Sequence, residues 1–271
     1  MIVFIASHNC FAQEQIEYKN IDTTRLYMQI YQPEKMDKTQ KKPAMVFFFG
    51  GGWKKGSVKQ FEPHAKYFAK RGMVCFLVDY RVESRHNFTI FESVQDAKSA
   101  IRYIREHADL YNVDTLKIVA SGGSAGGHLA AAAAIIEEYN EVTDSMLISC
   151  KPNALVLFNP AIDNGPAGVG YDRVKDAYKN ISPIHNIKKG APPTIIMLGT
   201  KDDLIPVETA KYYQTVMNKV GSRCDLILYE GKGHGFFNYD KFDNYKITIA
   251  DADIFLQSVG YLTEYPKVAI D

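Results

Sequence analysis

The chain has 271 residues, of which 46% are hydrophobic, so it is long enough to bury the core of one large α/β domain. Its 32 basic and 31 acidic side chains give a formal net charge of +1, which argues against a nucleic-acid-binding protein with a strong basic surplus. Cys10, Cys75, Cys150 and Cys224 form no C-x-x-C pair and fit no zinc pattern. We therefore expect free structural cysteines, with one disulfide as the alternative.

The first residues of the chain, 1–12, read M-I-V-F-I-A-S-H-N-C-F-A. This short apolar stretch resembles the end of a secretory signal peptide cleaved after Ala12, although the basic residues that usually precede such a stretch are missing. We expect a secreted or periplasmic protein, with a cytoplasmic one as the alternative. No later stretch reaches the ~18 uninterrupted apolar residues of a membrane span.

Hydrophobic patterns predict strands that alternate with helices along the chain. The predicted strands are residues 26–31, 43–49, 73–78, 116–120, 154–158, 194–198 and 225–229. The predicted helices are residues 58–71, 94–107, 129–136, 207–220 and 247–261. Because this alternation requires crossover connections, we expect an α/β fold with a mostly parallel central sheet and helices on both faces. Residues 159–190 show no clear period and are predicted to form a lid or a substrate loop.

The segment Gly122-Gly123-Ser124-Ala125-Gly126 matches G-x-S-x-G between a predicted buried strand and an alanine-rich predicted helix. This setting is typical of a nucleophile elbow, in which a sharp turn projects the serine hydroxyl above the sheet. The helix N-terminus supplies aligned N–H groups for a developing oxyanion. An idle serine or a phosphate-binding turn is the alternative, but the G-K-[ST] ending of a phosphate loop is missing. The pattern therefore predicts Ser124 as a nucleophile.

His234 lies between two glycines, after the last predicted strand. A neutral imidazole in such an exposed loop can take the serine proton and pass it to a leaving group, so we predict His234 as the general base. Two other histidines, His86 and His185, fall in loops and stay candidates for substrate contacts. Three fall in predicted helices, where a packed or solvated ring is expected: His64, His107 and His128.

A glycine-rich segment, Phe49-Gly50-Gly51-Gly52-Trp53, follows an early predicted strand, and its backbone is free to turn an N–H group toward a substrate oxygen. Together with G-x-S-x-G and the later Asp79-Tyr80-Arg81, it resembles the esterase branch of the α/β-hydrolase family, which carries H-G-G-G at this place. The resemblance implies an oxyanion hole formed by the N–H groups of Gly51, Gly52 and Ala125. Phe49 takes the place of the family's histidine, which supports the loop.

Two aspartates, Asp202 and Asp203, follow the predicted strand of residues 194–198. A carboxylate at this place orients the imidazole and stabilises its charged form. The preceding residues resemble the family's G-x-x-D motif, which aligns with Asp202, whereas Asp203 has the alternative of a helix cap or a turn. Asp163, after the preceding strand, is a further candidate acid. The order Ser124, Asp202, His234 is the order of the family.

The similarity extends from about Leu26 to Tyr261 and implies one α/β-hydrolase catalytic domain over residues 13–271. It is nearest to bacterial acetyl esterases and acetylxylan-esterase-like enzymes, which implies hydrolysis of short acyl esters, including O-acetyl groups of carbohydrates, without a metal or a cofactor. A prolyl-oligopeptidase-type peptidase usually carries a large gating domain, for which this chain has no room. A catalytically silent binding module would be expected to have lost a triad member. An acyltransferase differs only in excluding water.

Overall fold

The computed structural model describes residues 13–21, 23–34, 37 and 39–270, so the leader-like residues 1–12 and Cys10 lie outside the described residues. In the described part of the chain, eight strands form one sheet. They are β1 (Gln13–Ile21), β2 (Thr24–Tyr31), β3 (Lys42–Phe48), β4 (Val74–Val78), β5 (Val113–Gly123), β6 (Ala154–Phe158), β7 (Thr194–Gly199) and β8 (Cys224–Tyr229).

The strands lie side by side in the order β1-β2-β4-β3-β5-β6-β7-β8. The pairs β1–β2 and β2–β4 are antiparallel, and every other neighbouring pair is parallel. Every residue of β4, β6 and β7 is buried, as expected of parallel strands covered on both faces. The prediction of a mostly parallel sheet is confirmed.

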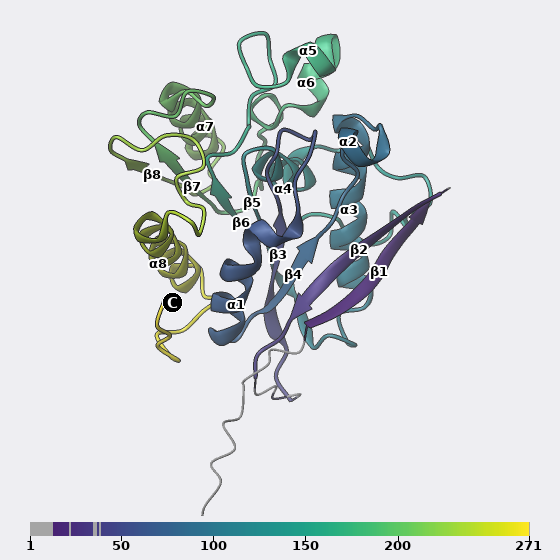
Figure 1. Cartoon of the computed structure of the whole chain (residues 1–271), viewed down its shortest axis with the longest axis vertical. Helices are drawn as coiled ribbons and strands as arrows, with labels where there is room; N and C mark the ends of the chain where they lie inside the picture. The colour runs from purple at the N-terminus through teal and green to yellow at the C-terminus, as the bar shows by residue number, and fades with distance from the viewer. Residues whose placement is uncertain (1–12, 22, 35–36, 38, 271) are drawn as a thin grey trace, which may run out of the picture.

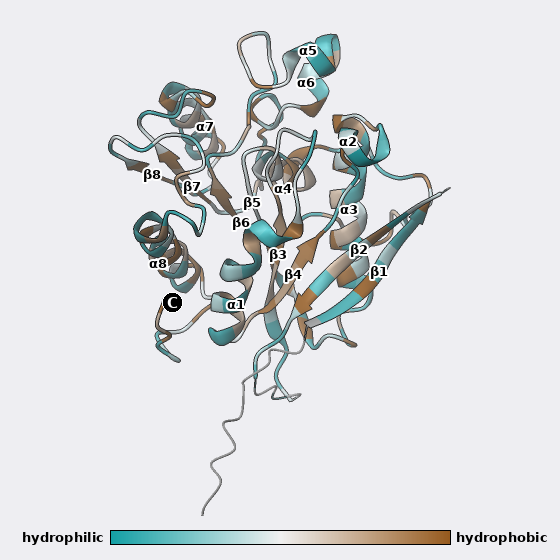
Figure 2. Ribbon diagram, viewed as in Figure 1, coloured by the Kyte–Doolittle hydropathy of each residue, from teal (hydrophilic) through white to brown (hydrophobic). Residues whose placement is uncertain are grey.

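Helices cover both faces of this sheet (Figure 1). One face packs against α1 (Glu62–Lys70) and α8 (Phe242–Ser258), and the other packs against α3 (Ile90–Glu106), α4 (Ala125–Ile135) and α7 (Val207–Lys219). The strands between them are mostly apolar, whereas the outer sides of the helices carry polar residues (Figure 2). The sheet therefore separates two hydrophobic cores, one on each face.

Short helical segments complete the fold. They are η1 (Val58–Phe61), α2 (Glu83–His86), α5 (Tyr171–Val174), η2 (Lys175–Ala177), α6 (Tyr178–Ile181) and η3 (Pro183–His185). Four of the six fall within residues 159–190, the segment without a clear period. Figure 1 shows α5 and α6 at the top of the molecule, beyond the end of the sheet where the parallel strands finish.

Several element boundaries differ from the prediction for identifiable reasons. β1 was not expected because its residues are mostly polar; it forms as an edge strand, through main-chain pairing with β2. The predicted helix of residues 58–71 is divided into η1 and α1, because Pro63 lacks an N–H group and favours the first turn of a helix. The helix expected from residue 129 begins at Ala125, directly after Ser124. α8 begins at Phe242 rather than at residue 247.

The sequence predicted no membrane span after the first residues and free structural cysteines. Within the part of the chain that the structure describes, no helix is long and apolar enough to cross a membrane. Cys75, Cys150 and Cys224 are free thiols, of which Cys75 and Cys224 are buried.

Candidate active site

The turn between β5 and α4 holds Ser124 in a strained conformation. Its φ of 53° and ψ of −117° lie in a region that side-chain-bearing residues rarely adopt. The Ser124 N–H donates to the Phe158 carbonyl at 3.0 Å, and the Ser124 carbonyl accepts from the Ala161 N–H at 3.0 Å. Phe158 is the last residue of β6 and Ala161 lies just after it, so the neighbouring strand and the segment after it fix the strained turn.

Glycines flank this turn because the backbone approaches other segments too closely for a side chain. A Cβ atom on Gly126 would lie 2.0 Å from the Phe48 carbonyl oxygen, and one on Gly122 would lie 2.4 Å from the Gly126 backbone. Both distances are far below van der Waals contact, so α4 can begin beside β3 and β5 only with glycine at these two positions. The G-x-S-x-G spacing therefore has a steric cause in this fold.

Ser124, His234 and Asp202 form a continuous hydrogen-bonded line. His234 Nε2 lies 2.9 Å from Ser124 Oγ. His234 Nδ1 lies 2.8 Å from Asp202 Oδ2 and 3.0 Å from Oδ1. The imidazole is 20% exposed, whereas the carboxylate is fully buried. The three residues follow the ends of β5, β7 and β8, which the parallel sheet brings to one edge.

Asp202 is oriented by its own turn as well as by the histidine. Its Oδ1 accepts from the N–H groups of Leu204 and Ile205, both at 2.9 Å. Burial by itself raises the pKa of Asp202, but the hydrogen bonds from His234 and from the two backbone N–H groups outweigh it and lower that pKa below its ordinary value. The carboxylate therefore stays ionised and can stabilise a charged imidazole.

The other candidate acids lie elsewhere. Asp203 is exposed. Asp163 Oδ1 accepts from the Gly165 N–H at 2.7 Å, within its own loop. Neither contributes to the line of Ser124, Asp202 and His234.

Asn159, at the end of β6, holds the loop that carries His234, and the sequence reasoning missed it. The side chain is fully buried. Its Oδ1 accepts from the Gly235 N–H at 3.1 Å, and its Nδ2 lies 3.5 Å from His234 Nε2. Gly235 has a φ of 70°, which favours glycine. Because many asparagines occupy strand ends, nothing in the local sequence distinguishes Asn159.

The glycine loop after β3 lies beside the serine turn. Gly51 and Gly52 have φ values of 125° and 65°. Within the described residues, neither of their N–H groups donates to a backbone acceptor. Ala125 is the first residue of α4, where helix N–H groups lack acceptors inside the helix. The three groups are therefore free to meet a substrate oxygen, and their role as oxyanion donors stays a prediction.

Phe49 supports this loop by packing. Its ring is buried and stacks on Tyr80, with ring centroids 4.1 Å apart. The Tyr80 hydroxyl donates to the Phe49 carbonyl at 2.7 Å. The tyrosine of the Asp79-Tyr80-Arg81 segment thus fixes the backbone at the point where the resemblance expects a histidine.

Comparison with known proteins identifies the family. The model of the BD-FAE family matches residues 28–164, about half of the chain, and this range includes the glycine loop and Ser124. The chain belongs to this family.

A solved structure of Thermogutta terrifontis esterase 2, phosphoramylated by tabun, shares 45% sequence identity with this BD-FAE family member. The two superpose with a TM-score of 0.89, over 94% of this chain and 97% of the other. Structures of the same esterase with butyrate or propionate bound superpose with TM-scores of 0.89 and 0.88, at 42% and 43% identity. The single α/β-hydrolase domain predicted from the sequence is thereby confirmed, in a family of carboxylic-ester hydrolases.

Curated relatives of this BD-FAE family member include further esterases. Esterase LipC of Mycobacterium tuberculosis is 28% identical over 73% of this chain and 54% of its own length. An acetylxylan esterase of Xylanibacter ruminicola is 25% identical over 71% of this chain and 41% of its own length. The chain spans about half the length of the curated relatives it matches.

In this family member, the segment of residues 159–190 is tied to the glycine loop. Arg173, in α5, donates to the Gly52 carbonyl at 2.6 Å. Trp53, which is buried, donates from Nε1 to His128 Nδ1 at 3.3 Å. His128 Nε2 lies 3.0 Å from the Ile181 carbonyl, so that nitrogen is the donor and the ring is neutral. Burial lowers the pKa of His128 to about 4, which agrees with this tautomer.

Three further histidines contact neighbouring groups in their own parts of the fold. His64 is buried among aromatic rings, and burial lowers its pKa to about 3, so it is neutral, as expected of a packed ring. His86 Nδ1 accepts from the Val82 N–H at 3.1 Å. His185 Nδ1 lies 3.0 Å from Ser182 Oγ. None of these contacts involves the serine turn.

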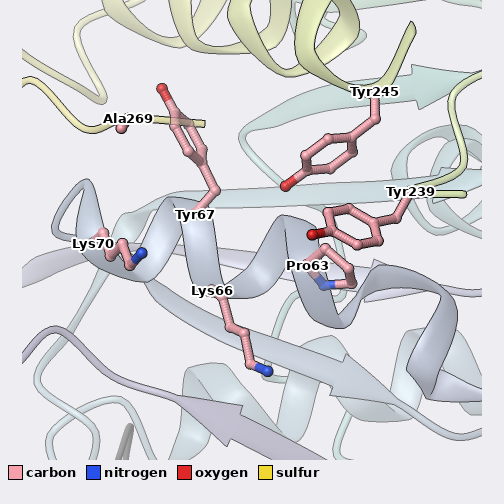
Figure 3. Close-up of a pocket in the computed structure, with 7 residues that line it drawn as sticks. All are labelled: Pro63, Lys66, Tyr67, Lys70, Tyr239, Tyr245 and Ala269. Atoms are coloured by element: carbon pink, nitrogen blue, oxygen red, sulfur yellow. The ribbon is translucent and has the colours of Figure 1, made fainter. Parts of the chain in front are cut away.

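A separate cavity of about 260 Å³ lies between α1 and α8 (Figure 3). Tyrosines and lysines contribute most of its lining: Tyr67, Tyr239, Tyr245, Lys66 and Lys70. The serine, the aspartate and the histidine of the hydrogen-bonded line are not among its lining residues. Within the described residues, no group of three or more His, Cys, Asp or Glu side chains could hold a metal ion.

Proposed function

We propose that the protein hydrolyses carboxylic esters with Ser124 as nucleophile, His234 as general acid and base, and Asp202 as the group that orients His234. The observation that carries this proposal is the hydrogen-bonded line from Asp202 through His234 to Ser124 Oγ, at 2.8 and 2.9 Å, beside a strained turn. The 2.9 Å distance lies within the range required for proton transfer between a nucleophile and its base, and the 2.8 Å distance is that of a hydrogen bond that orients the base.

In the proposed mechanism each group has a defined role. Neutral His234 accepts the hydroxyl proton at Nε2 while Ser124 Oγ attacks the ester carbonyl carbon. Asp202 stabilises the imidazolium through Nδ1 without taking its proton. The N–H groups of Gly51, Gly52 and Ala125 stabilise the oxyanion. His234 then protonates the leaving alcohol, and a water molecule activated by the same imidazole releases the acid from Ser124.

The proposed substrates are short acyl esters, above all acetyl esters, including O-acetyl groups of carbohydrates. Two kinds of relative support this choice. Thermogutta terrifontis esterase 2 has been solved with propionate and with butyrate, which are short acids. The curated relatives include an acetylxylan esterase.

The first test compares Ser124→Ala with a matched control on p-nitrophenyl acetate. We expect Ser124→Ala to lower kcat by about 10⁴-fold or more, because the nucleophile is removed while the fold is kept. Ser121→Ala is the control, since Ser121 is also buried on β5 and its hydroxyl has no hydrogen-bond partner within the described residues. It should change kcat by less than about twofold. Serine-independent turnover with a normal circular-dichroism spectrum would contradict the nucleophile assignment.

The second test concerns the acyl group. Rates on p-nitrophenyl acetate, butyrate and octanoate should fall in that order, and acetylated xylan should release acetate. A preference for octanoate would instead indicate a lipid or general esterase. Turnover of the small esters without release of acetate from the polymer would restrict the proposal to small-molecule esters.

A further inference from the structure

A chain of side-chain hydrogen bonds joins the glycine loop to the loop of His234. Gln60, in η1, accepts at Oε1 from the Gly50 N–H at 2.6 Å. Its Nε2 donates to Asn238 Oδ1 at 2.8 Å, across 178 positions of sequence. Asn238 Nδ2 in turn donates to the Gly235 carbonyl at 2.9 Å. Each side-chain amide accepts one hydrogen bond at its oxygen and donates one from its nitrogen, so all three bonds run in the same direction from the glycine loop to the loop of His234.

At the glycine loop, this series of hydrogen bonds helps to hold one peptide unit in place. The Phe49 carbonyl and the Gly50 N–H belong to the same planar group. The carbonyl accepts from the Tyr80 hydroxyl, and the N–H donates to Gln60. A Cβ atom on Gly50 would lie 3.5 Å from Ser124 Cβ, so this peptide is adjacent to the nucleophile. Because both polar groups of this peptide unit are hydrogen-bonded, its orientation is restrained. The orientation of the N–H groups of Gly51 and Gly52, which follow it, is restrained as a consequence.

At the second end, the residue after His234 is also held on both of its polar groups. The Gly235 N–H donates to Asn159 Oδ1, and the Gly235 carbonyl accepts from Asn238. Asn159 directly follows β6 of the central sheet, whereas Asn238 is hydrogen-bonded to Gln60, which contacts the glycine loop. Hydrogen bonds therefore connect the loop of His234 to two places, the end of β6 and the glycine loop.

We propose that Gln60 and Asn238 are positioning residues that set the distance between the proposed oxyanion donors and the His234 imidazole. The inference rests on the proposed function. Both side chains are only half-buried, so water can replace part of each lost bond and the folded state should tolerate their removal. Catalysis is more sensitive, because a displacement of about 1 Å in a positioning group can lower the rate by about 10²-fold.

The test uses Gln60→Leu and Asn238→Leu in the full chain, with concentrations of competent enzyme set by titration of the active serine. Each variant should lower kcat on p-nitrophenyl acetate by about 10- to 100-fold, with KM changed by less than about threefold. Gln214→Leu is the matched control, since Gln214 Nε2 donates to the Cys224 carbonyl at 2.9 Å between α7 and β8, away from the site. It should leave kcat within about twofold of the wild type.

Two double variants separate positioning from general stability. Because the bonds lie in series, Gln60→Leu with Asn238→Leu should be no slower than the slower single variant, whereas independent effects would multiply. Gln60→Asn with Asn238→Gln moves one methylene from one side chain to the other and keeps the total length. It should recover at least tenfold of the activity lost by either swap alone. A purely structural role predicts a lower Tm with unchanged kcat per titrated serine, and no rescue by the swap.

The positioning role of Gln60 and Asn238, here called the clamp, and the proposed function can fail separately. A wild type without Ser124-dependent ester turnover would overturn the proposed function, and the clamp would then be judged by the rate at which a fluorophosphonate labels Ser124. Labelling slowed at least tenfold in the two leucine variants, but not in Gln214→Leu, would support the clamp. Turnover and labelling equal to those of the wild type in both leucine variants would overturn it.

Discussion

Two aspartates, Asp96 and Asp202, have fully buried carboxylates in this protein, and their partners differ. Asp96, on α3, accepts from Lys19 Nζ at 2.6 Å and from Arg81 Nη2 at 2.7 Å. Glu141 lies 2.9 Å from the same lysine and 3.1 Å from the same arginine. Two carboxylates and two cations form a group without net charge, which joins β1, α3 and the segments after β4 and α4.

Asp202 instead has backbone N–H groups on one side and an imidazole on the other. The imidazole leads to Ser124 Oγ rather than to another cation. A buried carboxylate whose partners are already cations contacts no group that gains charge during a reaction, so its role is to stabilise the fold. One that faces a titratable ring can stabilise charge that appears during a reaction.

The largest expected effect is on activity, from Asp202→Asn. An amide can still fill the site, but it cannot stabilise the imidazolium or select the tautomer. We expect kcat on p-nitrophenyl acetate to fall by about 10³- to 10⁴-fold, while Tm changes little. Asp203→Asn, at the exposed neighbour, should change kcat by less than about twofold. A loss of similar size in both variants would remove the distinction between the two aspartates.

The second effect is on stability, from Asp96→Asn. This change leaves Lys19 and Arg81 with one carboxylate fewer in a buried place, which typically costs about 3–5 kcal/mol of unfolding free energy. In a domain of this size, Tm should fall by roughly 10 °C. Urea unfolding measures the free energy, and kcat per titrated serine in the remaining folded protein should stay within about threefold of the wild type. A normal free energy of unfolding would show that water or a shifted neighbour replaces the lost charge.

A smaller loss should follow from Lys19→Met, in the same group of charges. Arg81 still contacts Asp96 through its backbone N–H and its guanidinium, so the carboxylate keeps one permanent cation. We expect a loss of about 1.5–3 kcal/mol, the range for a hydrogen bond to a charged group. A loss equal to that of Asp96→Asn would mean that the lysine, rather than the arginine, is the main partner of the carboxylate.

The smallest effect concerns pH. The pKa of Asp202 is lower in the folded protein than in the unfolded chain, so its ionised form contributes stability that is present above the unfolded value of about 3.9 and is lost as pH falls through the folded value. The wild type and Asp202→Asn should therefore differ by a constant free energy of unfolding above about pH 5, and the difference should shrink as the pH falls below that value. Urea titrations from pH 5 downward measure it. A difference that grows on acidification would contradict the lowered pKa.

Much of the fold was predictable because the central strands are covered on both faces. Such strands need apolar side chains at every position, and β4, β6 and β7 accordingly appear as continuous apolar runs. The polar edge strand β1 has no such requirement, so its pairing with β2 left no pattern to detect. The serine turn was predictable for a steric reason, since its glycines are required by contacts within a few residues of Ser124 and with the adjacent strand.

The pattern of apolar residues was enough to locate the buried strands, though not all of their ends, and to select the serine, the aspartate and the histidine that follow them. The contacts that hold these three residues in place depend on the folded chain. Gln60 and Asn238 are 178 positions apart, and Trp53 and His128 are 75 apart. Polar residues of these types occur in many loops, and no spacing rule selects their partners. Their contacts exist because the sheet brings the ends of distant strands to one edge, which is a property of the folded chain.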